Sequence, residues 1–188
     1  MDFTRKVPLT GDLVTLEPVS TGHVSAIEPL LDDPEVAILT GTSHTSTPTA
    51  ARPWTSAQLA ETYARWATAS DRLVWAIREN STGRIVGESV LNDLDPGNRS
   101  CGFRIWIAGA TGRGLGTEAV RLTMAHAFEV QQLHRVSLEV YAFNPRARHV
   151  YAKAGFRHEG TMREALRFDG GWVDAELMAM LRTDRPAP

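Results

Sequence analysis

A short glycine-rich segment stands directly before a run of helix-forming residues. Residues 111–119 read TGRGLGTEA, in which Gly112, Gly114 and Gly116 alternate with other residue types. Glycines placed in this way let backbone N–H groups close around an anion at the start of a helix, where the helix dipole also attracts negative charge. The segment therefore predicts a binding site for a phosphate-bearing molecule.

Three kinds of phosphate site can be compared with this segment. A Walker loop is excluded, because it needs a Gly-Lys pair before Ser or Thr and residues 109–119 contain none. A dinucleotide-binding fingerprint is matched by residues 114–119, with Glu139 about 20 residues further on. That fingerprint needs several successive strand–helix units, whereas hairpin-linked strands precede this loop. A pyrophosphate held between such a strand and a helix is favoured, with a dinucleotide-binding oxidoreductase as the alternative.

The spacing of apolar residues predicts an α/β fold in which helices pack on a mixed sheet. Asn144 suits a helix N-cap, Pro145 the first helical position and Gly155 the helix end. The Ser- and Thr-rich residues 40–50 predict a loop. The predicted strands are 13–16, 73–78, 85–91, 101–107, 134–143, 156–168 and 172–181, and the predicted helices are 21–31, 55–69, the segment after the glycines and the segment from Asn144 to Gly155.

Composition limits the classes of protein that fit. The chain has 188 residues and is expected to form a single domain over 1–188, with 182–188 as a frayed tail. A formal net charge of −2 without clustered Lys and Arg predicts no nucleic-acid partner. No apolar signal core or membrane-length apolar run occurs, so a cytoplasmic protein without a membrane partner is expected. One cysteine, Cys101, and no paired histidine motif predict no metal site.

A second stretch points to a known family. Residues 138–156 read LEVYAFNPRARHVYAKAGF, in which a strand ends at Asn144 and the next helix closes with Tyr-x-Lys-x-Gly-Phe. Together with the 111–119 segment, this stretch resembles the two central motifs of the GNAT N-acetyltransferases. Thr111 stands where that family usually has Gln or Arg, and Ala147 where it often has Ser. The segments LVTLEPVS and EGTMREALRFDGGWVDAELMAML resemble the ribosomal-protein N-terminal acetyltransferase branch, RimJ/RimL-like.

The resemblance implies a fold, an activity and a set of binding residues. The fold is a mixed, mostly antiparallel central sheet of about seven strands flanked by helices, with a splay between the two central parallel strands. The activity is transfer of an acetyl group from acetyl-CoA to a primary amine by direct attack. The acceptor is a protein N-terminal amine or a small-molecule amine, no metal takes part, and a homodimer is possible. The implied coenzyme-binding residues are Ile105, Trp106, Ile107, Gly112, Arg113, Gly114, Leu115, Gly116, Thr117, Asn144 and Arg146.

Acetyl transfer to an amine needs a group that accepts the amine proton and a group that protonates the departing thiolate. Tyr151 lies about two helical turns after Asn144, on the same side of the predicted helix, and the resemblance implies that it faces the sulfur. It is the predicted acid. Glu139, on the polar face of its strand, is the predicted base, acting directly or through water. Asp93 and Glu88 are alternative bases.

Two questions stay open at the level of the sequence. A non-catalytic acyl-CoA-binding or sensing domain is the alternative to an enzyme, although the presence of both Glu139 and Tyr151 argues against it. The acceptor is not identified by any motif. Residues 40–50, the helix 55–69 and the hairpin 168–172 are the predicted rim of its pocket.

Overall fold

The computed structural model describes residues 1–47, 54–109 and 112–184. Within these ranges eight strands form one sheet in the order β1-β2-β3-β4-β5-β6-β8-β7. The β5–β6 pair is parallel and the other neighbouring pairs are antiparallel. The predicted mixed, mostly antiparallel sheet is therefore confirmed. It has one strand more than expected, because the two-residue β1 (Leu9–Thr10) also pairs.

The first half of the sheet is antiparallel throughout. Its strands are β2 (Val14–Pro18), β3 (Leu73–Glu79), β4 (Ile85–Asp95) and β5 (Ser100–Ile107). Short turns join β3 to β4 and β4 to β5, whereas several helices stand between β2 and β3 in the chain. β3 is buried on both faces, which explains its nearly continuous apolar sequence. The register of β4 against β5 shifts between Asn92 and Asp95. Such a bulge bends a strand and redirects its side chains.

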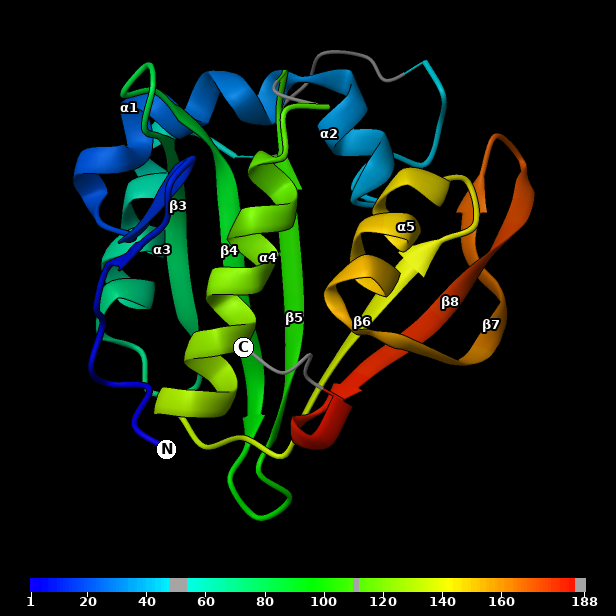
Figure 1. Ribbon diagram of the computed structural model, residues 1–188. Helices are drawn as coiled ribbons and strands as arrows, with labels where there is room; N and C mark the ends of the chain where they lie inside the picture. The colour runs from blue at the N-terminus through cyan, green and yellow to red at the C-terminus, as the bar shows by residue number, and fades with distance from the viewer. Residues whose placement is uncertain (48–53, 110–111, 185–188) are drawn as a thin grey trace.

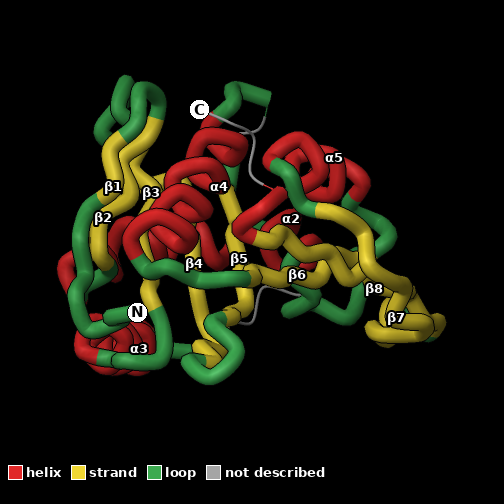
Figure 2. Tube along the Cα trace, turned by 60° about the horizontal axis from the view of Figure 1, so that its bottom comes forward, coloured by secondary structure: helices red, strands yellow, loops and turns green. Residues whose placement is uncertain are grey.

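Helices cover both faces of the sheet (Figures 1 and 2). On one face lie α4 (Leu115–Ala125), its π-helical continuation η3 (His126–Val130) and α5 (Pro145–Ala154). The other face packs against α3 (Ser56–Thr68) and the helical segment that precedes it along the chain. That segment comprises η1 (Thr21–His23), α1 (Val24–Ile27), η2 (Glu28–Asp32) and α2 (Pro34–Leu39).

Local sequence signals predicted some of the observed helices and missed others. The capping box that predicted the helix 55–69 is present, with Thr55 and Gln58 bonding each other's backbone N–H groups. The predicted helix 21–31 is helical but divided by 3-10 turns, one of which contains Pro29. The short α2 was not predicted, although Asp33 caps it and a proline follows at its first position. Residues 40–47 form a loop as expected, and 48–50 lie outside the described residues.

The sheet divides two hydrophobic cores. The larger one lies under α4 and α5 and includes Trp75, Phe103 and Phe128. The smaller one joins α1 and α3 to the opposite face of β3 and includes Ile27 and Tyr63. None of the helices in the described ranges is long and apolar enough to cross a membrane.

The two parallel strands at the centre of the sheet diverge. β5 and β6 (Arg135–Tyr141) pair only from Ser100 to Gly102, opposite Arg135 to Ser137. Beyond that point they separate into a wedge that is visible in Figure 1. β6 instead pairs along its whole length with β8 (Gly171–Leu181), which continues to β7 (Arg157–Phe168). The predicted splay is thus present, and it leaves one edge of β5 without a partner strand.

Candidate active site

A cavity of about 900 Å³ occupies the wedge between β5 and β6. It extends to the start of α4 at one end and to α5 along its side. Ten of the eleven residues predicted to bind the coenzyme line it: Ile105, Trp106, Ile107, Gly112, Gly114, Leu115, Gly116, Thr117, Asn144 and Arg146. Tyr151 and Glu139 line the same cavity. The fold therefore gathers these separated segments around one space.

The glycine loop (residues 112–117) supplies one end of the cavity. Gly114 is the N-cap of α4 and has a φ of 81°, a left-handed conformation that a side chain disfavours. The N–H groups of Leu115, Gly116 and Thr117 are at the first three helical positions, where no intrahelical acceptor exists. A cluster of backbone donors therefore faces the cavity at the positive end of α4.

Arg113 is the predicted loop residue that does not line the cavity. Its guanidinium pairs with the buried carboxylate of Glu79, which also accepts bonds from Ser81 (3.1 Å) and Thr82 (2.9 Å). The side chain of Arg113 is therefore engaged by the β3–β4 turn. Thr111, where the sequence departs from the family pattern, lies outside the described residues.

The free edge of β5 forms a long wall of the cavity. From Phe103 to Ile107 the strand pairs with β4 on one side only, because β6 has diverged. Its outward-facing backbone groups are available to an extended ligand. Trp106 lines the wall while its indole Nε1 donates to Glu88 at 3.0 Å. The indole is therefore held from behind by β4.

Tyr151 enters the cavity from α5. Its ring is buried and packs against Phe103 and Phe156, with centroid distances of 6.3 and 5.9 Å. Burial raises the pKa of the phenol to about 12. Within the described part of the chain, its hydroxyl has no hydrogen-bond partner. The group is therefore protonated at neutral pH and can donate its proton to a ligand.

The start of α5 contributes two further groups. Asn144 caps the helix by accepting from the N–H of Ala147 at 3.0 Å, and it lines the cavity. Arg146 also lines the cavity, and its guanidinium lies 3.1 Å from Glu35 of α2. This ion pair links α5 to α2 at the cavity mouth. Arg148, by contrast, pairs with Glu176 on β8.

The three candidate bases are in different environments. Glu139 on β6 and Asp93 at the β4 bulge are exposed and line the cavity. Glu88 is buried, is bonded by the hydroxyl of Tyr63 and the indole of Trp106, and does not line the cavity. Burial raises the pKa of Glu88. The geometry therefore places Glu139 and Asp93 on the same cavity as Tyr151 and leaves Glu88 outside it.

Sequence reasoning missed several cavity residues. They include Leu39, Thr40, Asn92, Arg104 and Ser137. Arg104 and Ser137 could have been found by strand alternation, since each faces away from the larger core. Asn92 was missed because the predicted strand ended at residue 91, whereas β4 continues to Asp95.

The predicted acceptor rim is only partly present. Residues 44–46 bond to the β7–β8 turn: the N–H of Asp169 donates to the carbonyl of His44 at 3.0 Å, and the N–H of Ser46 donates to the Asp169 carboxylate at 2.9 Å. The loop and the hairpin are therefore neighbours, but of their described residues only Thr40 lines the cavity. The prediction for the helix 55–69 was wrong: among the described residues that line the cavity, none comes from α3. Its apolar face is instead used by the smaller core.

Comparison with known proteins places the chain in a family. The family model of an acetyltransferase (GNAT) domain matches residues 14–157. The chain therefore belongs to the GNAT acetyltransferase family. The crystal structure of spermidine N-acetyltransferase from Vibrio cholerae in complex with CoA and spermine is similar, with a TM-score of 0.80 and 22% identity, covering 93% of this chain and 98% of that one. This likeness supports the fold.

Curated relatives are similar over part of their length. The spermidine N(1)-acetyltransferase of Vibrio cholerae is 28% identical over 106 residues, which cover 56% of this chain and 61% of the relative. The ribosomal protein uS5-alanine N-acetyltransferase of Escherichia coli is 32% identical over 73 residues, or 39% of this chain and 38% of the relative. The matched part of the chain thus spans between 38% and 61% of the length of these relatives.

Proposed function

We propose that this protein transfers an acetyl group from acetyl-CoA to a primary amine. The observation that carries the proposal is a single cavity combining four features: free N–H groups at a helix start, an unpaired strand edge, a buried phenol and an exposed carboxylate. A thioester coenzyme and an attacking amine need these four kinds of group together. Membership of the GNAT family supports the same reaction.

The donor substrate is held mainly by the backbone in this proposal. The N–H groups of the glycine loop, from Arg113 to Thr117, bind the pyrophosphate, aided by the dipole of α4. The free edge of β5, residues 105–107, pairs with the pantetheine arm. Asn144 and Arg146 contact the coenzyme from the start of α5. The fit rests on the chemistry of the donors, since unpaired N–H groups suit phosphate and an open strand edge suits an amide-bearing arm.

The chemical step requires two proton transfers. The amine nitrogen bonds to the thioester carbonyl carbon as the carbon–sulfur bond breaks. Glu139 accepts the proton that the amine loses, directly or through a water molecule. Tyr151 donates its phenolic proton to the departing thiolate, a role that suits a buried hydroxyl whose pKa of about 12 keeps it protonated.

The acceptor is proposed to be a primary amine carried by a peptide N-terminus or by a small molecule. Glu139 and Asp93 put two carboxylates on the cavity wall beside Arg104, and these carboxylates can attract an ammonium group. The names of the two curated relatives specify spermidine and an alanine residue of a ribosomal protein, and both acceptors present primary amines. The RimJ/RimL-like character of the sequence favours the peptide N-terminus.

A screen of purified protein tests the proposal. Acetyl-CoA is offered with peptides of varied N-terminal residue and, separately, with spermidine and other small amines, and free CoA release is measured. Turnover with one of these classes, and its loss in Tyr151→Phe, is expected. Acetyl-CoA binding without turnover on any amine would indicate a non-catalytic acyl-CoA-binding domain. A thermal shift with NAD but none with CoA would indicate the dinucleotide alternative and overturn the proposal.

A further inference from the structure

The first turn of α4 carries a carboxylate that points away from the cavity. Glu118 accepts hydrogen bonds from three consecutive backbone N–H groups at the end of the β1–β2 turn and the start of β2: Asp12 at 3.1 Å, Leu13 at 2.7 Å and Val14 at 2.8 Å. These groups belong to a segment more than 100 residues distant in sequence. The contact is close, since a Cβ on Gly11 would lie 2.6 Å from Glu118 Oε2. Only a glycine fits there without moving the carboxylate.

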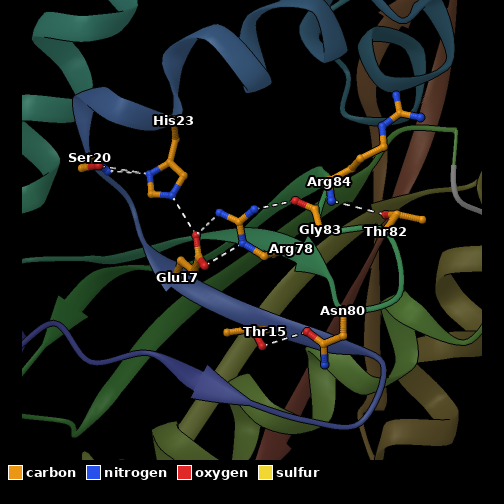
Figure 3. A network of polar contacts seen from close by, with 9 residues as sticks. All are labelled: Thr15, Glu17, Ser20, His23, Arg78, Asn80, Thr82, Gly83 and Arg84. Atoms are coloured by element: carbon orange, nitrogen blue, oxygen red, sulfur yellow. Dashed lines mark hydrogen bonds and ion pairs between the residues drawn. The ribbon is translucent and has the colours of Figure 1, made fainter.

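The turn that Glu118 binds is itself fixed from its other side. Asn80, in the β3–β4 turn, donates to the carbonyls of Gly11 (2.9 Å) and Asp12 (3.1 Å). Thr15 in turn donates to Asn80 at 2.9 Å, as Figure 3 shows. The residues that donate to Glu118 therefore belong to a turn that is itself fixed by hydrogen bonds to Asn80.

The glycine loop reaches the same two turns at its other end. Arg113 pairs with Glu79 at the base of the β3–β4 turn, and a Cβ on Gly114 would lie 3.3 Å from the side chain of Leu13. The loop is thus tied on both sides of the N–H groups that face the cavity, by Arg113 before them and by Glu118 after them. Neither the side chain of Arg113 nor that of Glu118 lines the cavity.

The position of Glu118 also has an electrostatic consequence. A carboxylate in the first turn of a helix stabilises the helix dipole but repels a second anion bound there. By turning Glu118 onto three N–H groups, the fold neutralises that charge locally and keeps it out of the cavity. If Glu118 acted only through its charge, removing that charge would make an anion bind more tightly at the start of α4. If Glu118 acts by holding the loop in position, its removal would weaken anion binding.

We propose that Glu118 is the positioning residue of the coenzyme loop: by binding residues 12–14, it fixes the start of α4 so that its N–H groups meet the pyrophosphate. This inference rests on the proposed function. It assigns to the β1–β2 turn, which does not touch the cavity, a part in coenzyme affinity.

The test uses Glu118→Gln and Gly11→Ala. Gln keeps the length of the side chain, but its amide nitrogen cannot accept, so at least one of the three bonds is lost. Gly11→Ala leaves every charge in place and displaces the carboxylate sterically. Matched controls are Glu61→Gln, at an exposed position of α3, and Gly160→Ala, where a Cβ meets nothing within 4 Å. CoA affinity is measured by calorimetry, and KM for acetyl-CoA and kcat by free CoA release.

Both test variants are expected to raise the Kd for CoA and the KM for acetyl-CoA about tenfold, with kcat within about twofold of the wild type. The controls are expected to change neither. Unchanged or tighter CoA binding by a folded Glu118→Gln would overturn the inference. If that variant unfolds, Gly11→Ala decides by the same measurement. Failure of the wild type to bind CoA would instead contradict the proposed function itself.

Discussion

The proposed coenzyme end and the proposed acceptor end of the cavity are built from different parts of the polypeptide. At the coenzyme end, the glycine loop and the edge of β5 present backbone groups, held in place by contacts such as Glu118 with residues 12–14. At the acceptor end, the wall is made of side chains, among them Asp93, Arg104 and Glu139. A backbone site depends on geometry and tolerates changes of many side chains. A side-chain site can be altered by one substitution, so the two ends can vary independently.

The largest effect should come from blocking the backbone end. Gly114→Val and Gly116→Val are each expected to weaken CoA binding by at least about 100-fold, because a branched side chain prevents close approach of the phosphates to the loop. At Gly114 the positive φ adds strain. Calorimetric titration with CoA checks this, with thermal unfolding to show that the variants fold. A folded Gly116→Val that still binds CoA normally would remove the loop from the site.

The second largest effect should fall on turnover alone. Tyr151→Phe removes the phenolic proton and is expected to lower kcat by about 10²-fold or more, with the Kd for CoA within about twofold. Because the pKa of the wild-type phenol is about 12, its deprotonation should not limit kcat below about pH 11. An equal loss of coenzyme binding and turnover would indicate that Tyr151 serves packing against Phe103 and Phe156.

A smaller effect distinguishes the two exposed carboxylates at the acceptor end. Glu139→Gln is expected to lower kcat/KM for the amine about 10- to 100-fold and to leave CoA affinity unchanged. The loss should shrink at high pH, where more of the amine is already deprotonated. Asp93→Asn is the matched comparison, and a larger loss in that variant would transfer the role of base from Glu139 to Asp93.

The gathering of the glycine loop, Asn144 and Tyr151 around one cavity could be predicted from the sequence because the signals are local. The glycines of the loop lie close together, and Asn144 and Tyr151 share one helix whose cap and C-terminal glycine are legible in the chain. The order of strands along the chain came from the apolar patterns, whereas the splay came from the family resemblance. The short β1 and α2 were missed, since two and six residues leave too little periodicity to detect.

The acceptor end could be predicted only in part, because the choice among its candidate bases depends on tertiary contacts. Glu88 and Glu139 both lie within predicted strands, and their local sequence does not show which of them faces a cavity. α3 places Tyr63 over Glu88, whereas β6 lies beyond the reach of that helix, so Glu139 stays open to the cavity. The partner of Arg113 lies 34 residues earlier in the chain, on another turn. No local pattern distinguishes such an arginine from one that binds a phosphate.

The smallest expected effect concerns a polar network outside the cavity. Figure 3 shows Glu17 of β2 between Arg78, whose Nε and second terminal nitrogen each lie 2.7 Å from its carboxylate, and His23 at 3.1 Å. The bonds from Arg78, then those from His23, lower the pKa of Glu17 to about 2. None of these three described residues lines the cavity between β5 and β6. The network should therefore affect stability and leave coenzyme affinity unchanged.

The pH dependence of that stability has a definite sign. Since the pKa is lowered on folding, the stabilisation is complete above the ordinary value of 4.5 and is lost as the pH falls through about 2. Glu17→Gln should therefore be less stable than the wild type by about 1 kcal/mol at pH 7, a value reduced for solvent screening of this partly exposed pair. This corresponds to a Tm lower by about 2–4 °C, and the difference should vanish near pH 2. Denaturant unfolding from pH 2 to 7 measures it, with Glu61→Gln as the control. A difference in unfolding free energy that persists at pH 2 would indicate that the substitution acts through packing. An altered Kd for CoA would show that this part of the sheet is coupled to the coenzyme end.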